Sequence, residues 1–535
     1  MGIPVYFKTI VSQYHQDILD TGRPVIGTLC LDLNCLIHPC CREILSQGVS
    51  DESRMIQKIL ETIETLIAYT HVQGTLYIAI DGVAPRGKMK QQRQRRHKSI
   101  LEPTKWDTNA ISPGTFFMGS LNDALVQWKE SRASSLSIVL SDSTEPGEGE
   151  HKILDFVKQG TEGPVAIYGL DADLIMLGMV SGVSDILLLR ERTEYNIENC
   201  PNEYIYLKVD ALKARILRDL QIETPFPEST IIHDYIFLCF LLGNDFINHS
   251  ATLSLRYNGL DPLLNTYRML QKRYQGYFQL IDTDLEHLIH LPFFKEFLLE
   301  LAKHEPSLWD ATAQTRQTQA KRLHGQFQHE FREWERFRQG PHSLTKNQGL
   351  PTQGSKGSKG SHKQGHKGHQ GRHKGHTRTS RISLTDLSRF QALDPENKER
   401  RDMINQLPLF YASQERSVLT HSYYGEDSVD AVCQDYLDSL VWTSHYYFRG
   451  CYHWSWCTTY HRGPLLRDLA RFVGQQDRLT LESNPTPQTC QEQLQYIFPP
   501  QSFHLQPFSL EATQTKDLVL DVLFSRYLWE CEILF

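Results

Sequence analysis

Four short apolar segments in the first third of the chain have the pattern of buried β-strands. They are residues 25–33, 74–80, 136–141 and 164–170. Segments with helical periodicity, such as residues 51–71, lie between them. Strands that alternate with helices favour a parallel arrangement, because each connection crosses back over the sheet. The sequence therefore predicts an α/β fold in which helices flank a mostly parallel sheet.

An acidic residue lies at the end of each of these segments or shortly after it. A fifth apolar segment, residues 234–242, has a helical pattern and also leads into an acid. Glu148 and Glu150 alone would be explained as acids at a helix N-terminus. The repeated arrangement indicates more, because open α/β sheets bind ligands at the carboxyl ends of their strands. Seven acids are expected to converge there: Asp32, Asp81, Glu148, Glu150, Asp171, Asp173 and Asp245.

Seven converging carboxylates would repel one another and raise one another's pKa values. Hard divalent cations remove this repulsion, and Mg²⁺ takes oxygen ligands, keeps several waters and bridges to phosphate. Two such ions about 3.5–4 Å apart stabilise both the attacking and the leaving oxygen in phosphoryl transfer. The acids therefore predict a metal site with two Mg²⁺ ions, with Mn²⁺ as an alternative ion.

A basic segment begins directly after one of these acids and extends to Lys98. Pro85 and Gly87 indicate a turn, and the residues after it have helical propensity. Four side chains recur at i, i+4, i+7 and i+8 and so share one helix face. They are Lys88, Gln92, Arg95 and Arg96. Arginine offers paired donors to phosphate oxygens, so this face is predicted to bind phosphate.

Charge is distributed unevenly along the chain. Residues 341–380 contain six Lys, two Arg and no acids, so the rest of the chain carries −15 where the whole carries −7. An acidic body taken alone argues against a nucleic-acid partner, but bound cations invert the sign of an acidic pocket. Gly, Ser, Lys and His dominate residues 341–380, which predicts a disordered basic linker able to make weak, salt-sensitive contacts with a phosphate backbone.

Cysteine usage indicates the compartment. The 11 cysteines are scattered without a C-x-x-C pair, as is typical of free thiols in a reducing interior. No apolar run approaches the length that spans a bilayer. We therefore expect an intracellular protein without a membrane partner.

Five motifs resemble the series found in the XRN 5′→3′ exoribonucleases, in the same order and with similar spacing. They are Asp32-Leu33-Asn34, Asp81-Gly82-Val83-Ala84-Pro85-Arg86, Pro146-Gly147-Glu148-Gly149-Glu150-His151-Lys152, Tyr168-Gly169-Leu170-Asp171-Ala172-Asp173 and Leu242-Gly243-Asn244-Asp245-Phe246. The resemblance covers residues 1 to about 255 and resumes within residues 442–469. There, Tyr446-Tyr447-Phe448-Arg449-Gly450 and Trp454-Ser455-Trp456 resemble the family's second conserved region.

The resemblance implies a PIN- or flap-nuclease-like core and processive, Mg²⁺-dependent removal of nucleotides from single-stranded RNA with a 5′ monophosphate. It places the seven acids at the metals and Lys88, Gln92, Arg95 and Arg96 at the 5′ phosphate. It also implies that His38 stacks on the terminal base, opposite Trp454 or the nearby Trp456. The chain resembles a short member without the long C-terminal domains, and a cytoplasmic monomer is expected.

The domain organisation predicted from these features has four parts. Residues 1–255 form the nuclease core, residues 256–340 a helical extension and residues 341–380 the linker. Residues 381–535 form a second, mainly helical region that packs on the core and closes the pocket.

Two other functions compete with this interpretation. A flap-type, structure-specific DNA nuclease would share the acid layout, but residues 442–469 resemble the exoribonucleases. A non-catalytic RNA-binding scaffold would be indicated by loss of an acid, and none is lost.

Overall fold

The computed structural model describes most of the chain. The described residues are 3, 5–99, 105–132, 136–161, 163–169, 171–192, 202–221, 227–255, 258–274, 280–281, 288–326, 381–383, 423–511, 519–521 and 531–535. The chain divides into two units, of which the first combines Met1–Thr312 with Tyr424–Thr513. The second combines Ala313–Tyr423 with Gln514–Phe535. The four predicted domains stay predictions, and residues 341–380 lie outside the described residues.

A seven-stranded sheet organises the first unit, in the order β1-β7-β6-β5-β2-β3-β4. The five strands from β6 to β4 run parallel, and β7 and β1 extend the sheet in antiparallel pairing. This confirms the predicted mostly parallel sheet. The strands are β1 (Leu19–Asp20), β2 (Thr28–Asp32), β3 (Thr75–Ala79), β4 (Ser137–Ser141), β5 (Val165–Tyr168), β6 (Ile186–Glu191) and β7 (Tyr204–Lys208). Leu170, the last residue of the fourth predicted strand, lies outside the described residues.

The strand order places a switch point at β2. The chain builds outward from β2 through β3 to β4, and then returns to the other side of β2 with β5 and β6. The connections on the two sides of β2 therefore diverge and leave a crevice at its carboxyl end, where ligands bind in this fold class. Asp32 is the last residue of β2, so it stands at this switch point.

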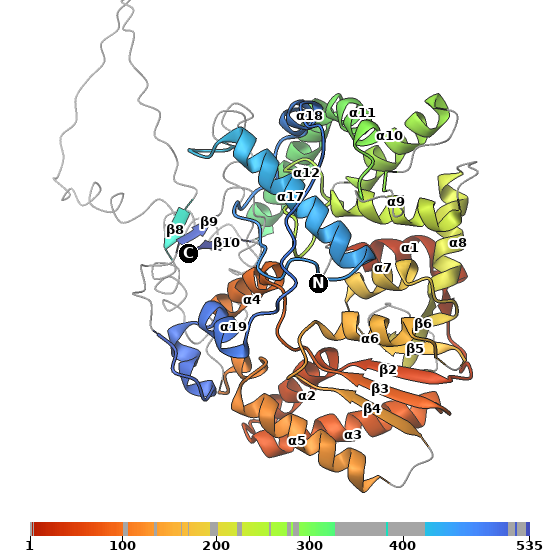
Figure 1. Cartoon of the computed structure of the whole chain (residues 1–535), viewed down its shortest axis with the longest axis vertical. Helices are drawn as coiled ribbons and strands as arrows, with labels where there is room; N and C mark the ends of the chain where they lie inside the picture. Colours follow the sequence, from red (N-terminus) through yellow and green to blue (C-terminus); the bar gives the residue numbers. More distant parts are fainter. Residues whose placement is uncertain are drawn as a thin grey trace, which may run out of the picture. The chain divides into compact units, whose positions relative to one another are not determined.

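Helices cover both faces of the sheet (Figure 1). Along β2 the buried side chains alternate: Leu29 and Leu31 pack with α2, α3 and α5, whereas Cys30 packs with α6, α7 and α8 on the opposite face. The helices around the sheet are α1 (Tyr6–Ile18), α2 (Asn34–Ser46), α3 (Glu52–Thr70), α4 (Arg86–Ser99), α5 (Phe116–Ser131), α6 (Gly149–Lys158), α7 (Ala172–Val180), α8 (Val209–Leu220) and α9 (Glu228–Phe240).

Segments from the end of the first unit pack into the same core. Trp442 and Tyr446 of α17 belong to the apolar cluster that contains α6, α7 and α9. The later helices are α10 (Leu260–Arg273), α11 (Leu291–Ala302), α12 (Glu305–Gln326), α17 (Val429–Phe448), α18 (Leu466–Gly474) and α19 (Cys490–Ile497), with 3₁₀ helices η1 (Thr108–Ala110) and η5 (Pro500–Leu505). None of the helices in the described ranges is both long and apolar enough to cross a bilayer.

The second unit contains a small antiparallel sheet. Its strand order is β10-β9-β8, formed by Glu532–Leu534, Val519–Asp521 and Arg381–Ser383.

Candidate functional site

The seven predicted acids gather at the carboxyl edge of the sheet. Asp32 ends β2, and Asp81 lies two residues beyond β3. Glu148 directly precedes α6 and Asp171 directly precedes α7, while Glu150 and Asp173 occupy the first turns of these helices. Asp245 follows α9. Each of the seven either raises the pKa of another or has its own pKa raised by another, so the structure brings them close together.

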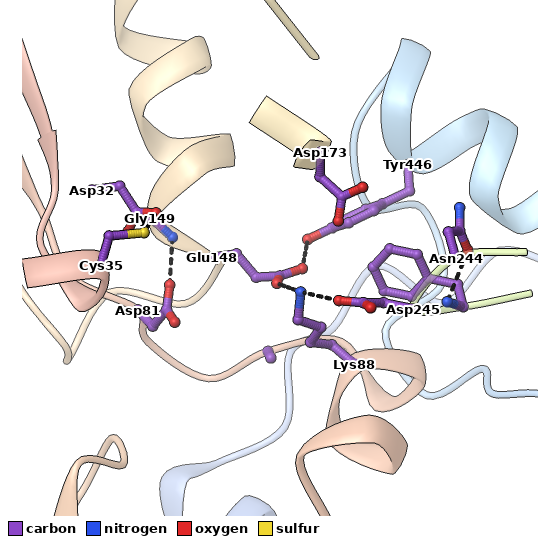
Figure 2. A network of polar contacts seen from close by, with 12 residues as sticks. Asp32, Cys35, Asp81, Lys88, Glu148, Gly149, Asp173, Asn244, Asp245 and Tyr446 are labelled. Carbon is purple, nitrogen blue, oxygen red and sulfur yellow. Dashed lines mark hydrogen bonds and ion pairs between the residues drawn. The ribbon is translucent and has the colours of Figure 1, made fainter. Parts of the chain in front are cut away.

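Lys88 lies inside this carboxylate cluster. Its Nζ is 2.6 Å from Glu148 Oε2 and 3.0 Å from Asp245 Oδ2 (Figure 2). Lys88 is buried, as are Glu148 and the side chain of Asp245. The basic segment therefore supplies a counter-charge to the acids. The sequence had predicted only that Lys88 binds the 5′ phosphate. Burying the ammonium costs less here because two carboxylates pair with it.

Gly149 allows the acids to approach the start of α6. Its backbone N–H donates to Asp81 Oδ1 at 2.7 Å (Figure 2). A Cβ atom at this position would lie 2.9 Å from Asp32 Oδ1, closer than side chains tolerate. Cys35 contributes a further contact, since its thiol donates to Asp32 Oδ2 at 3.0 Å. The glycine in this motif is therefore required by close packing of two carboxylates against the helix.

Two tyrosines that the sequence did not assign to the site complete its wall. Tyr446 Oη donates to Glu148 Oε1 at 2.6 Å, and Tyr447 Oη donates to Asp173 Oδ1 at 2.6 Å. Both belong to α17, and their only signal in the sequence was their place in the second conserved region. His151 was also missed, although it directly follows Glu150. One of its ring nitrogens lies within 4.8 Å of carboxylate oxygens of Glu148 and Glu150.

Burial controls the charge of several acids. It raises the pKa of Asp32 to about 7, and the nearby Asp81 carboxylate adds to this effect. It also raises the pKa of Asp173 to about 7, with Asp171 as the second cause. The pKa of Glu150 rises well above its ordinary value for the same two kinds of reason. Without a cation, the cluster therefore retains protons near neutral pH.

Lys88 acts in the opposite direction. Burial alone would raise the pKa of Asp245, but the Lys88 ammonium reverses this, and the pKa lies below its ordinary value. Burial alone would lower the pKa of Lys88, but Glu148 and Asp245 raise it well above its ordinary value. Lys88 is therefore charged, and it holds Asp245 in the ionised form.

The donor set suits a hard divalent cation. The seven acids supply carboxylate oxygens, which are the ligands that Mg²⁺ prefers. Among the described residues, the buried Oδ2 of Asp173 has no hydrogen-bond partner, as expected of an atom placed to meet a cation. Burial lowers the pKa of His151 to about 4, so its imidazole is neutral and able to act as a ligand. The residues present therefore fit a metal site.

The four residues predicted to bind phosphate lie on α4 in different environments. Gln92 is buried, and among the described residues its Oε1 has no hydrogen-bond partner. Arg96 donates to Ser112 Oγ from Nη2 at 2.7 Å and from Nε at 3.0 Å. Arg95 is exposed. Two of the four, Lys88 and Arg96, therefore already have protein partners, and Arg95 presents its guanidinium to solvent.

The three residues predicted to stack on a base also differ. The His38 residue is exposed on α2. Desolvation of its ring by the surrounding protein lowers its pKa to about 4, and the charges of Arg96, Arg42 and Arg95 add to this effect. Trp456 stacks on Trp442, with ring centroids 5.3 Å apart. Trp454 is half-buried, and no ring in the described part of the chain packs against it. Trp456 is thus used in packing, and Trp454 remains the candidate for stacking.

Comparison with known proteins gives matches along most of the chain. Residues 1–105 and 100–192 match the XRN 5′-3′ exonuclease N-terminus, and residues 225–516 match the Xrn1 helical domain. The chain is 26% identical over 606 residues to 5′-3′ exoribonuclease 2 of Yarrowia lipolytica, covering 90% of this chain and 59% of that protein. It is 27% identical over 531 residues to 5′-3′ exoribonuclease 1 of Homo sapiens, covering 88% of this chain and 29% of that protein.

The chain thus spans less than two thirds of the length of either relative. Among solved structures, the catalytic core of Rad2 in complex with a DNA substrate aligns with a TM-score of 0.31 and 11% identity, over 56% of this chain and 85% of that one.

Proposed function

Because the chain belongs to the XRN family of 5′-3′ exonucleases, we propose that it is a processive 5′→3′ exoribonuclease. It degrades single-stranded RNA that carries a 5′ monophosphate and releases mononucleotides by hydrolysis of phosphodiester bonds. The observation that carries this proposal is the placement of seven acids and Lys88 at one edge of the sheet, beside the basic helix α4.

In this proposal the acids hold two Mg²⁺ ions. Asp173 offers its unpartnered Oδ2, and Glu148 and Glu150 lie close enough to share a cation. Such ions, when bound, supply Lewis-acid activation of water and stabilise the leaving oxygen. The protein's own residues exclude water from the cluster and fix the carboxylates, and Lys88 balances part of their charge.

The proposed selectivity for the 5′ end depends on α4 and α2. Arg95 and Gln92 offer donors to one terminal phosphate, and Arg95 is exposed and so accessible to RNA. A base held between His38 and Trp454 would place that phosphate at the end of a closed pocket. A triphosphate or a cap adds charge and bulk that such a pocket does not accommodate, so both ends are rejected by exclusion.

The test uses three RNAs that differ only at the 5′ end, as monophosphate, triphosphate and hydroxyl, and a DNA of matched sequence. We expect rapid decay of the monophosphate RNA in Mg²⁺ and slow decay of the other substrates. In EDTA, no substrate should decay. Asp173→Asn should retain its fold and lose activity. Equal decay of all three RNAs would exclude the pocket, and preferred cleavage of branched DNA would favour a flap-type nuclease.

A further inference from the structure

The hydroxyl groups of two adjacent tyrosines reach the carboxylate cluster from a distant part of the sequence. Tyr446 is 298 residues from its partner Glu148, and Tyr447 is 274 residues from its partner Asp173. Both tyrosines are 3% exposed. Consecutive residues on a helix point about 100° apart, so the last turn of α17 directs one hydroxyl to α6 and the other to α7.

Each tyrosine fixes one oxygen of its carboxylate and leaves the second for another partner. Glu148 receives Tyr446 on Oε1 and the Lys88 ammonium on Oε2. Asp173 receives Tyr447 on Oδ1, while its Oδ2 has no hydrogen-bond partner among the described residues. The Tyr447 contact therefore determines which Asp173 oxygen is presented to a ligand.

Each phenol donates its O–H to one carboxylate oxygen, at 2.6 Å in both cases. A neutral donor beside a carboxylate fixes its rotamer without competing for a cation. The two contacts therefore act on geometry and add no charge to the site.

Aromatic packing holds the phenol rings in place. The Tyr446 ring lies 3.9 Å from the His151 ring and 4.8 Å from the Trp442 ring, measured between centroids. The Tyr447 ring contacts Phe240 edge-on at 4.8 Å. Rings packed on several sides do not change rotamer freely. The hydroxyl positions are thus set by the core before any ligand binds.

We propose that Tyr446 and Tyr447 are positioning residues, which hold Glu148 and Asp173 in the orientation that a divalent cation requires. The inference rests on the proposed hydrolytic function of this cluster. Removing a hydrogen-bond partner of a metal ligand typically lowers metal affinity or catalytic activity by about 10–100-fold. Replacing either tyrosine by phenylalanine removes one oxygen atom and keeps the packed ring.

The experiment compares Tyr446→Phe and Tyr447→Phe with Tyr235→Phe. Tyr235 is a matched control, because it is also buried and its hydroxyl pairs with Tyr6 Oη at 3.2 Å, apart from the acids. We expect kcat to fall by about 10–100-fold in both site variants with KM nearly unchanged. The affinity of RNA-free protein for Mn²⁺, measured by electron paramagnetic resonance, should also fall by about tenfold. Tyr235→Phe should match the wild type in both.

The proposal is overturned if both site variants match Tyr235→Phe in kcat and in Mn²⁺ affinity. It is also overturned if the variants only melt at a lower temperature and their folded fraction has full activity, because the tyrosines would then serve stability alone. Failure of the proposed function gives a different result: the wild type would bind Mn²⁺ and leave RNA intact. In that case the Mn²⁺ affinities still decide the role of the two hydroxyls.

Discussion

Helix α4 presents two basic faces that serve different purposes. The active-site face carries Lys88, Gln92, Arg95 and Arg96, and its first member contacts Glu148 and Asp245. The docking face carries Arg86, Lys90 and Arg93 on the other side of the helix. The guanidinium carbons (Cζ) of Arg86 and Arg93 lie 3.3 and 4.8 Å from the centroid of the Tyr496 ring. Lys90 Nζ donates to the carbonyl oxygen of Thr458 at 2.9 Å.

The two faces of α4 show that the role of a basic side chain depends on the groups it contacts and not on its residue type. On the docking face, cations meet neutral carbonyl oxygens and an aromatic ring, which hold residues near 458 and 496 against the helix. On the active-site face, the Lys88 ammonium contacts two carboxylates in a buried cluster. A run of basic residues therefore does not indicate one function, because the helical period divides it between two surfaces.

Removing Lys88 should produce the largest effect. In Lys88→Met, Glu148 and Asp245 lose their counter-charge, and breaking a buried pair costs about 3–5 kcal/mol. We expect RNA cleavage to fall by about 100-fold or more and the melting temperature to drop in EDTA. Mg²⁺ should restore part of the lost stability by replacing the ammonium. Lys90→Met on the docking face is the control and should keep its RNA-cleavage activity. Equal losses of activity in the two variants would contradict the assignment of different roles to the two faces of α4.

The titration of the acids should give the next largest effect. Asp32 and Asp173 have pKa values of about 7 in the folded protein against an ordinary 3.8. Between these values the folded state binds more protons at these two groups than the unfolded state, so their contribution to stability decreases as pH rises through that window. Histidines such as His151, whose pKa is lowered to about 4, titrate in the opposite sense, so the measurement compares EDTA with Mg²⁺ at each pH. Because Mg²⁺ competes with the protons on the acids, the rise in melting temperature that it produces should grow on the order of 5 °C from pH 5 to pH 8. Calorimetry at matched ionic strength checks this, and a Mg²⁺ effect that is the same at both pH values would contradict the protonated cluster.

We expect replacement of Arg95 to change recognition of the RNA 5′ end without changing stability. Its side chain is exposed, so Arg95→Ala should leave the melting temperature unchanged. It should reduce the preference for a 5′ monophosphate over a 5′ hydroxyl by about tenfold, the value of one charged hydrogen bond. Decay of the two RNAs on gels measures this ratio. Arg93→Ala should leave the ratio as in the wild type; a changed ratio there would place the docking face in RNA recognition.

The smallest effect is expected on the docking face. Tyr496→Leu removes the ring that Arg86 and Arg93 contact, and each cation–π contact contributes about 0.5–1 kcal/mol. The melting temperature should fall by about 2–4 °C, while kcat per folded molecule stays constant. Thermal denaturation and single-turnover kinetics on one preparation measure both quantities. A fall in kcat with unchanged melting temperature would show that this face also acts in catalysis.

The sequence supported prediction of the strands and acids because both depend on local patterns. Apolar segments ending in acids indicated β2, β3, β4 and β5, and parallel pairing brought Asp32 and Asp171 to one edge. The pattern did not reveal β6, β7 and β1, which extend the sheet beyond β5. It also did not reveal that Lys88 pairs with Asp245. That contact depends on how a helix and a loop far apart in sequence pack, which no local period encodes.

The tyrosines of α17 show the same limit more strongly. Tyr446 and Tyr436 are both buried residues of α17. The hydrophobic pattern of residues 429–448 therefore does not distinguish one from the other. Only the folded chain shows that one hydroxyl meets Glu148. The structure likewise separates Trp456, which stacks on Trp442, from Trp454, although the two lie in one short motif.

The long sequence separation of these tyrosines from the acids has a consequence for protein synthesis. A ribosome delivers the seven acids and α4 well before it reaches α17, and domains fold in the order in which they emerge. Until α17 is made, Glu148 and Asp173 lack the hydroxyl groups that orient them, and Lys90 lacks the carbonyl oxygen of Thr458. The nascent chain therefore carries the acids of a nuclease without their final geometry while it is still attached to its own messenger RNA.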